Sequence, residues 1–297
     1  MKEKPIITVF TPTYNRIHTL SRTYKSLQHQ NNHSFIWLII DDGSTDNTSN
    51  VVKKWATEEK QFQIRYIYKE NGGMHTAHNT AYQFIDTELS ICIDSDDCLA
   101  EGAIDRIVEF WTKNNSNKYA GIIGLDADFK GNIIGTEFPE SLHETTLTGY
   151  YSSGGRGDKK IVYRTDIIRK YPKYPVFSGE NYVGLNYLYL LIDQDYKLLV
   201  LNEVLCNVDY QSDGSSATML KQYKRNPKGF IALRKLYMEY PVSRKRLFID
   251  CIHYVSSCIF DNDRNFIKKS RWKGYTIVAI PFGIILNLYI RFKTRNM

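Results

Sequence analysis

The stretch that decides the fold is Leu89-Ser90-Ile91-Cys92-Ile93-Asp94-Ser95-Asp96-Asp97, a mostly apolar run followed by three closely spaced aspartates. Residues 89–93 predict a buried strand, because short apolar runs are typical of strands that are covered on both faces. The aspartates repel one another unless a cation or a shared proton stabilises them, and oxygen ligands suit Mg²⁺ or Mn²⁺. The alternative is an acidic turn that caps a helix after Ala100. This run alone does not decide between the two.

The residues before this stretch alternate short apolar runs with helical patterns, which predicts βαβ units on a mostly parallel sheet. Strands are expected at residues 6–11, 35–40 and 64–68. The second of these ends in Asp41-Asp42-Gly43-Ser44, a segment that also suits an ordinary strand-to-helix turn. Ligands of open α/β sheets bind at the carboxyl ends of strands, so we expect Asp42 and the aspartates 94–97 at one edge.

The residues after this stretch have longer loops. Residues 121–135 predict a strand and a turn at Gly131-Asn132, and residues 150–158, rich in Gly and Ser, predict a mobile loop near a site or a plain surface loop. Helical patterns begin near Met219. We therefore expect one α/β domain over residues 1–218 and a helical region over residues 219–297.

The tail contains the apolar stretch 275–292, and basic residues gather on both sides of it, at 264–273 and 291–295. An uncharged run of about 16 residues is shorter than the roughly 20 that cross a bilayer, so an interfacial or re-entrant helix is favoured. A buried core helix is the alternative. The favoured interpretation places the protein in peripheral contact with a membrane.

The composition excludes several classes of protein. With 42% hydrophobic and 24% charged residues, the chain is typical of folded proteins. The five cysteines show no metal-ligand spacing, and the apolar run at 6–10 is too short for a signal peptide, so we expect a reducing cytoplasm, at the inner face of the membrane. The net charge of +7 suits polyanions, but no nucleic-acid recognition module is visible, and no nucleic-acid partner is expected.

Four motifs in order carry a resemblance to a known family. They are Thr11-Pro12-Thr13-Tyr14-Asn15-Arg16, Asp41 to Asp46, Asn71-Gly72-Gly73 with Ala77-His78-Asn79, and the aspartate run at 94–97. Together the motifs resemble the inverting family 2 glycosyltransferases of the GT-A fold. The resemblance implies a Rossmann-like, mostly parallel sheet flanked by helices, with a helical C-terminal extension. It makes 1–218 the catalytic domain, with 1–98 as the nucleotide-sugar-binding half and 99–218 as the acceptor half.

The resemblance also implies roles for residues of the donor site. Tyr14 would stack on the nucleobase, and Asp42 would accept a hydrogen bond from it. Asp94 and Asp96 would bind ribose and a Mn²⁺ or Mg²⁺ ion that bridges the diphosphate, with Asp96 and the adjacent Asp97 as metal ligands. The remaining expected donor-site residues are Thr11, Pro12, Arg16, Gly73, His78 and Ser95. His78 stands where many relatives have arginine, and a helix-packing histidine is the alternative.

In the family that the motifs resemble, the catalytic base is usually the aspartate of a Glu-Asp pair. This chain reads Gly179-Glu180-Asn181 at the matching segment. Asparagine takes no proton, so Glu180 is the expected base, with Asp193 and Asp195 as second choices. A surface glutamate before a helix is the alternative. Asp213, in a Ser-Asp-Gly-Ser segment, is added as part of a loop that closes over the donor.

The function implied is transfer of a sugar from a nucleoside-diphosphate donor, with UDP favoured, to a hydroxyl of a growing surface polysaccharide. A polyprenyl-diphosphate-linked acceptor would suit the apolar, basic tail. One alternative is a nucleotide- or polyanion-binding module without transfer activity. Another is a sugar nucleotidyltransferase, but the sequence has no glycine before Gly43 to form the phosphate loop of that class.

Overall fold

The computed structural model describes residues 5–211, 214 and 217–295 and divides into two compact units. The first comprises Met1–Pro172 and Leu191–Tyr210, and the second comprises Lys173–Leu190 and Gln211–Met297. The change near residue 211 is close to the boundary expected at 219. The segment Lys173–Leu190, expected in the first region, groups with the helices of the second unit.

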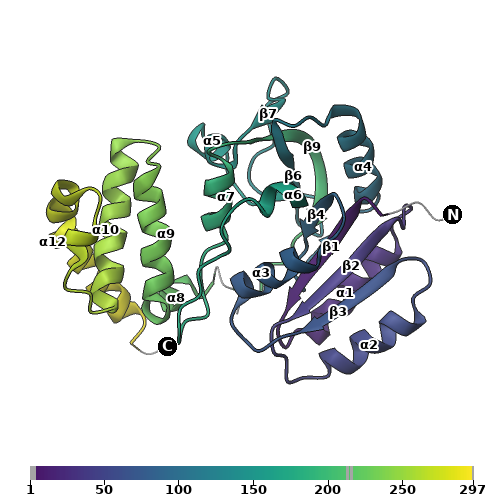
Figure 1. Cartoon of the computed structure of the whole chain (residues 1–297), viewed down its shortest axis with the longest axis horizontal. Coiled ribbons are helices and arrows are strands. Elements are labelled where there is room, and N and C mark those ends of the chain that lie inside the picture. The colour runs from purple at the N-terminus through teal and green to yellow at the C-terminus, as the bar shows by residue number, and fades with distance from the viewer. Residues whose placement is uncertain (1–4, 212–213, 215–216, 296–297) are drawn as a thin grey trace. The chain divides into compact units, whose positions relative to one another are not determined.

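The first unit opens with the expected parallel sheet (Figure 1). Its strands are β1 (Ile7–Thr13), β2 (Phe35–Asp41), β3 (Gln63–Tyr68) and β4 (Leu89–Cys92). The connecting helices are α1 (Ile17–Gln28), α2 (Thr48–Glu58) and α3 (Met74–Phe84). In the register, Ile7 pairs with both Phe35 and Leu89, so the carboxyl ends of β1, β2 and β4 point the same way. The prediction of βαβ units is therefore confirmed.

The rest of the first unit extends this sheet with mixed pairing. The added elements are β5 (Cys98–Leu99), α4 (Ala103–Asn114), β6 (Tyr119–Ala127), β7 (Glu144–Thr145), α5 (Leu147–Ser152), β8 (Lys159–Arg164), α6 (Thr165–Ile168) and β9 (Lys197–Asn207). In the described residues the order is β3-β2-β1-β4-β8-β6-β9-β5, with β7 on β9. The antiparallel strand β8 joins β4 to β6.

Two local expectations in this region have different outcomes. The turn at Gly131 is confirmed, since Asp128 and Asn132 are joined by a backbone hydrogen bond of 2.8 Å. The loop expected at 150–158 is partly wrong, because Tyr150 lies in α5 with 2% of its surface exposed. Its hydroxyl donates to the carbonyl oxygen of Thr136 at 2.9 Å, which ties this end of the segment down.

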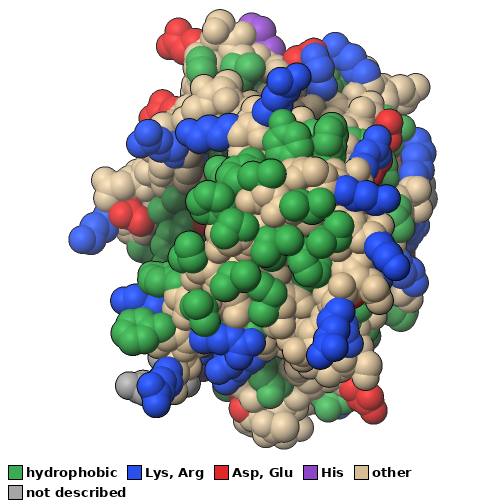
Figure 2. All heavy atoms as spheres, turned by 90° about the vertical axis from the view of Figure 1, so that its left-hand side faces the viewer, with side chains coloured by type: hydrophobic (Ala, Val, Ile, Leu, Met, Phe, Trp, Pro, Cys, Tyr) green, Lys and Arg blue, Asp and Glu red, His purple; other side chains and the backbone are tan. Residues whose placement is uncertain are grey.

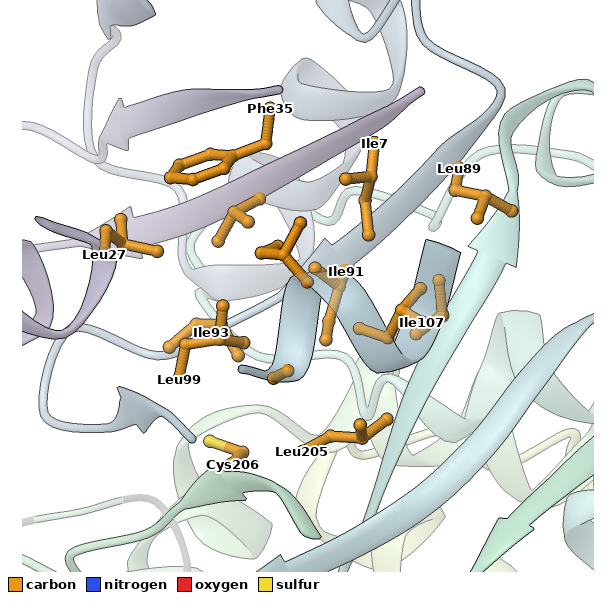
Figure 3. Close-up of a cluster of buried hydrophobic side chains, with 14 of the residues drawn as sticks. Ile7, Leu27, Phe35, Leu89, Ile91, Ile93, Leu99, Ile107, Leu205 and Cys206 are labelled. Carbon is orange, nitrogen blue, oxygen red and sulfur yellow. The ribbon is translucent and has the colours of Figure 1, made fainter. Parts of the chain in front are cut away.

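The sheet has a core on each face. Figure 3 shows one of them, in which side chains of β1, β2 and β4 meet Leu27 of α1 and Ile107 of α4. On the other face, Phe10 of β1 packs with Ala77 and Ala81 of α3. Because both faces are covered, every residue of β1 and β2 is buried, as expected for near-continuous apolar strands.

The second unit is helical, as expected from residue 219 onward. Its helices are α8 (Met219–Arg225), α9 (Pro227–Glu239), α10 (Arg244–Phe260), α11 (Phe266–Lys269) and α12 (Lys273–Lys293), and α7 (Asn186–Ile192) begins in it. Met238, Leu247, Tyr254 and Ala279 belong to its core. Of the described helices, only α12 has the length and apolar composition to cross a membrane, and 28% of its apolar window is buried.

Candidate active site

The exit of β1 forms one wall of the candidate site. Thr11 and Pro12 are buried, and the Thr11 hydroxyl accepts a hydrogen bond from the Trp37 indole at 3.0 Å. Tyr14, just past the strand, is 48% exposed, so its ring is accessible for stacking. Arg16 is partly exposed where α1 begins. The strand thus ends in a rigid buried part followed by an accessible aromatic ring.

Asn15 connects the exits of β1 and β2. Its φ of 52° lies in the left-handed region, which asparagine tolerates better than most residues. Its backbone N–H donates to the Ser44 hydroxyl at 2.9 Å, and its side-chain oxygen accepts from the Thr45 N–H at 2.7 Å. These two motifs, which are about 30 residues apart in the chain, therefore form one structured edge.

Asp42 lies at the centre of a small polar cluster beyond β2. It is 4% exposed, and its carboxylate accepts the backbone N–H groups of Gly72 at 3.1 Å and Gly73 at 2.7 Å. The Lys69 ammonium forms an ion pair with it. Gly73 has φ 88° and precedes the first turn of α3, a conformation that favours glycine. The cluster brings Asp42 and Gly73 together, as the motifs predicted.

His78, an expected donor-site residue, is part of the packing of α3 instead. His78 is fully buried, and its Nδ1 lies 3.1 Å from the Tyr82 hydroxyl while its ring packs edge-on against Phe10. Burial lowers the pKa of His78 to about 3, so it is neutral at pH 7. It therefore occupies the helix-packing position given above as the alternative, and its ring is not available to contact phosphate in this structure.

His75 is a residue that the sequence analysis missed. It is 1% exposed, and neither ring nitrogen has a hydrogen-bond partner in the described residues. Burial lowers its pKa to about 4, against the opposing charge of Asp42. An unpaired imidazole beside the Asp42 cluster is a candidate for contact with a ligand, because buried polar groups are normally paired. The only signal in the sequence was its place two residues after the Gly72-Gly73 pair.

Helix α1 holds the acidic turn after β4. The Arg22 guanidinium donates to the Asp96 carbonyl oxygen at 2.6 Å, and the Thr23 hydroxyl donates to the Asp97 carbonyl oxygen at 2.7 Å. Arg22 also pairs with Asp209 at 2.9 Å. The turn does not cap α4, because that helix begins after Gly102 and has no side-chain cap. The alternative interpretation as a helix cap is therefore wrong.

The side chains of Asp94 and Asp96 are suited to a divalent cation. In the described residues neither carboxylate forms an ion pair, although both are only partly exposed. Burial, and then the neighbouring charge of Asp94, raise the pKa of Asp96, so the pair is poorly compensated without a cation. No cluster of three His, Cys, Asp or Glu side chains in the described range has metal-binding geometry. A Mg²⁺ or Mn²⁺ ion here would take its other ligands from water and substrate oxygens, as these ions commonly do.

The Asp97 carboxylate, expected to be a metal ligand, points into the protein instead. It is 4% exposed, and its oxygens accept the backbone N–H of Asp209 at 3.2 Å and face the Lys160 ammonium at 3.8 Å. Lys160 also lies 3.9 Å from Asp126, whose pKa burial raises to about 6. Although its own burial opposes this, the surrounding carboxylates raise the pKa of Lys160. Asp97 and Asp126 thus share one buried cation.

Ser95 lies in the same turn and is 7% exposed, with its carbonyl oxygen 3.3 Å from the Thr23 hydroxyl.

The sequence analysis missed Arg22 and Lys160, because a lone arginine on an amphipathic helix and a lysine in a strand are ordinary residues there. Only the pairing of β8 with β4 and β6 brings Lys160 behind the aspartates.

The expected base lies in the second unit and has a structural task there. Glu180 is 8% exposed, so it is not the surface glutamate of the alternative interpretation. Its two oxygens accept the N–H groups of Lys228 and Gly229, each at 2.9 Å, in the first turn of α9. Helix α9 has no cap from its own N-cap residue, Asn226, so Glu180 supplies one.

The second choices for the base are also engaged. In the first unit, Asp193 accepts the N–H groups of Leu147 at 3.1 Å and Thr148 at 2.7 Å at the start of α5. Asp195 accepts the Tyr171 hydroxyl at 2.7 Å. Asp213 lies outside the described residues. The identity of the base therefore stays a prediction.

Comparison with known proteins identifies a family and several relatives for this chain. The chain is 28% identical over 171 residues to TarP of Staphylococcus aureus, a poly(ribitol-phosphate) β-N-acetylglucosaminyltransferase; the match covers 56% of this chain and 49% of that protein. The chain thus spans about half the length of this curated relative, and 22% of a Pasteurella multocida chondroitin synthase that it also matches.

Two solved structures share the fold. S. aureus TarS 1–349 with UDP-GlcNAc has a TM-score of 0.61 at 14% identity, covering 99% of this chain and 92% of that one. Pyrobaculum calidifontis mannosyltransferase PcManGT with GDP-Man and Mn²⁺ has a TM-score of 0.57 at 14% identity, covering 97% and 88%. Residues 8–171, more than half of the chain, match the family described as Glycosyl transferase family 2. The chain therefore belongs to glycosyl transferase family 2.

Proposed function

We propose that this protein transfers a sugar from a nucleoside-diphosphate donor to a hydroxyl group of a growing cell-surface glycan. The observation that carries the proposal is the pair Asp94 and Asp96, which α1 holds at the sheet edge and which lacks an ion-pair partner in the described range. A carboxylate pair that the fold holds without a close ion-pair partner in the described residues is suited to a ligand that brings cations.

The relatives support this proposal and favour particular donors. TarP is named for transfer of N-acetylglucosamine to poly(ribitol-phosphate), and TarS was solved with UDP-GlcNAc. We therefore propose a UDP-type donor, and an acceptor that is a polyhydroxylated polymer or a lipid-linked precursor of one. The mannosyltransferase solved with GDP-Man and Mn²⁺ supports a metal-dependent reaction.

The residues of this chain divide the chemistry as follows. Tyr14 would stack on the base, and the Asp42 cluster would bind the nucleoside, because these groups share the edge formed by the exits of β1 and β2. Asp94 and Asp96 would hold Mn²⁺ or Mg²⁺, which supplies charge neutralisation for the leaving diphosphate. An acceptor hydroxyl also needs a base, and Glu180 remains the proposed one.

A thermal-shift experiment tests the donor site. UDP, dTDP and GDP are each added to the purified chain with Mn²⁺ or with EDTA, and a ligand at 100 times its Kd should add about 2.7 kcal/mol of stability. We expect the largest shift with UDP and Mn²⁺, and loss of its metal-dependent part in Asp96→Asn. Glu109→Gln, an exposed acid on α4, is the matched control.

Two outcomes would oppose the proposal. Absence of any metal-dependent shift with all three nucleotides would contradict the donor site itself. A clear shift without transfer or hydrolysis of UDP-GlcNAc, or of other UDP-sugars, would instead favour a nucleotide-binding module without transfer activity.

A further inference from the structure

Helix α12 has two faces of different character, and one of them packs on α10. The buried residues of α12 recur every three or four positions, at Thr276, Ala279, Gly283, Asn287 and Ile290. Gly283 permits a close approach, since an added Cβ would lie 2.5 Å from a Val255 methyl group. The Asn287 amide donates to the Ser256 carbonyl oxygen at 3.1 Å. Small and polar residues therefore fix this face on its neighbour.

The opposite face is apolar and exposed. It consists of Ile277, Val278, Phe282, Ile284, Ile285, Leu288, Tyr289 and Phe292, with exposed fractions from 43% to 76%. No charged residue occurs between Lys273 and Arg291. Figure 2 shows this side of the molecule as a broad hydrophobic area bordered by Lys and Arg side chains. A contiguous apolar surface of this kind indicates an interaction site.

The residues around this apolar face are basic. From Arg264 to the end of the chain the sequence contains no Asp or Glu, and its cations are Arg264, Lys268, Lys269, Arg271, Lys273, Arg291, Lys293 and Arg295. Lys269 and Arg271 are paired with Asp263 and Glu239. Lys268, Lys273 and Lys293 form no ion pair with any residue that the structure describes. Trp272, 36% exposed, lies directly before the helix, and tryptophan is enriched at membrane interfaces. This pattern of charge complements anionic headgroups.

We propose that α12 is a docking face for an anionic lipid surface, with the helix lying in the plane of that surface. The eight exposed apolar side chains would enter the boundary between headgroups and acyl chains, and the cations at both ends of the helix would contact the headgroups. This inference concerns where the protein acts, and it does not depend on the proposed transfer activity.

The packing on α10 disfavours a membrane-spanning arrangement. With 21 residues, α12 is about 31 Å long, enough to cross a hydrocarbon core. Spanning would require α12 either to leave α10, which would expose the core residues Cys251 and Val255, or to take α10 along with its Arg246–Asp250 ion pair. Docking in the plane needs neither change. A second copy of the chain is disfavoured as the partner, because it would bring two cationic borders together.

Vesicle flotation of the full chain tests the docking. We expect the chain to float with vesicles of phosphatidylcholine and phosphatidylglycerol, and much less with phosphatidylcholine alone. The double variant Ile285→Asp/Leu288→Asp, at positions 64% and 59% exposed, should lower binding at least tenfold while far-UV circular dichroism stays unchanged. Phe84→Asp, an exposed apolar residue at the end of α3, is the control and should bind like wild type.

A charge variant measures the electrostatic contribution to vesicle binding. Lys268→Gln/Lys273→Gln/Lys293→Gln should weaken binding to the anionic vesicles at least tenfold. Lys54→Gln/Lys113→Gln/Lys130→Gln makes the same change in net charge outside the tail and should have little effect. An equal loss of vesicle binding in both triple variants would overturn the assignment of the docking face to the tail. So would a wild-type chain that ignores vesicles but is oligomeric by light scattering and becomes monomeric in Ile285→Asp/Leu288→Asp.

Depth measurements distinguish an in-plane helix from a spanning one. Ile285 is near the middle of α12, so Ile285→Trp in a Trp272→Phe background places a fluorophore there. The Trp272→Phe variant alone measures the emission of the remaining Trp37, Trp55 and Trp111, which is subtracted. We expect stronger quenching by lipids brominated near the headgroup than by lipids brominated deep in the acyl chain. Stronger quenching by the deep label would place residue 285 at the bilayer centre and overturn the in-plane arrangement.

Discussion

Asp96 in the first unit and Glu180 in the second unit are both partly or fully buried carboxylates, but their surroundings differ. Glu180 accepts two backbone N–H groups at 2.9 Å, which satisfies it within the protein. The Asp96 side chain has no ion-pair partner in the described residues, while its backbone is held by Arg22. Glu180 therefore stabilises the fold, whereas the fold holds the backbone of Asp96 in place.

The difference lies in the partners of each carboxylate, and each therefore calls for a different measurement. A satisfied carboxylate contributes to stability, and its removal should be measured in unfolding. A carboxylate left with a neighbouring like charge has its pKa raised, as at Asp96, and gains most when a cation binds. Four predictions test this comparison.

The largest effect is expected at Asp96. Asp96→Asn should lower kcat/KM with a UDP-sugar about 10³-fold, because metal-assisted stabilisation of a leaving group is worth several kcal/mol. Its unfolding free energy without metal should be unchanged or slightly higher, since the repulsion from Asp94 is removed. Steady-state kinetics and urea unfolding measure the two. Activity within tenfold of wild type would show that Asp96 is not at the reacting centre.

Lys160→Met tests the buried charges behind the acidic turn. Loss of the ammonium leaves Asp97 and Asp126 without their shared cation, and should lower the unfolding free energy by about 3 kcal/mol at pH 8. Burial raises the pKa of both carboxyls, so they take up protons in the folded state as the pH falls. The loss should therefore shrink at pH 5. Urea titrations at the two pH values check it, and a loss that is independent of pH would contradict this account.

His78 predicts a second, independent loss of wild-type stability as the pH falls. Its folded pKa of about 3 is below the ordinary 6.5, so its contribution is present above pH 6.5 and is lost as the pH falls toward 3. Between pH 7 and pH 5, wild type should lose about 2 kcal/mol more than His78→Leu. In the second unit, burial also lowers the pKa of His253 to about 3, and His253→Leu should behave alike. Parallel unfolding curves for wild type and both variants would contradict the prediction.

The smallest effect on stability is expected at Glu180. Glu180→Ala should lower the unfolding free energy by about 1–2 kcal/mol through loss of the α9 cap, and Glu180→Gln, which retains one oxygen acceptor, by less. If Glu180 is also the base, Glu180→Gln should lose at least 10²-fold in kcat while remaining folded. Full activity in both variants would exclude Glu180 as the base. Asn181→Asp then becomes the informative variant, since it supplies the aspartate that the family resemblance leads us to expect there.

Much of the fold was predictable, because the signals were local. The run 89–93, the turn at Gly131 and the start of helices at Met219 each depend on the periodicity and turn residues of a short segment. The order of the motifs predicted that the exits of β1, β2 and β4 share an edge, since parallel strands bring their carboxyl ends together.

The sequence by itself determined which carboxylates stand at the sheet edge, since that depends on where strands end. Only the tertiary structure decided what each side chain does there. The partner of Asp97 is 112 positions away at Asp209, that of Glu180 is 49 positions away at Gly229, and the ring of His78 is neutral because Phe10 and Tyr82 enclose it. Likewise, α12 became two-faced only by packing on α10. Desolvation and hydrogen bonding depend on neighbours in space, and no local pattern specifies them.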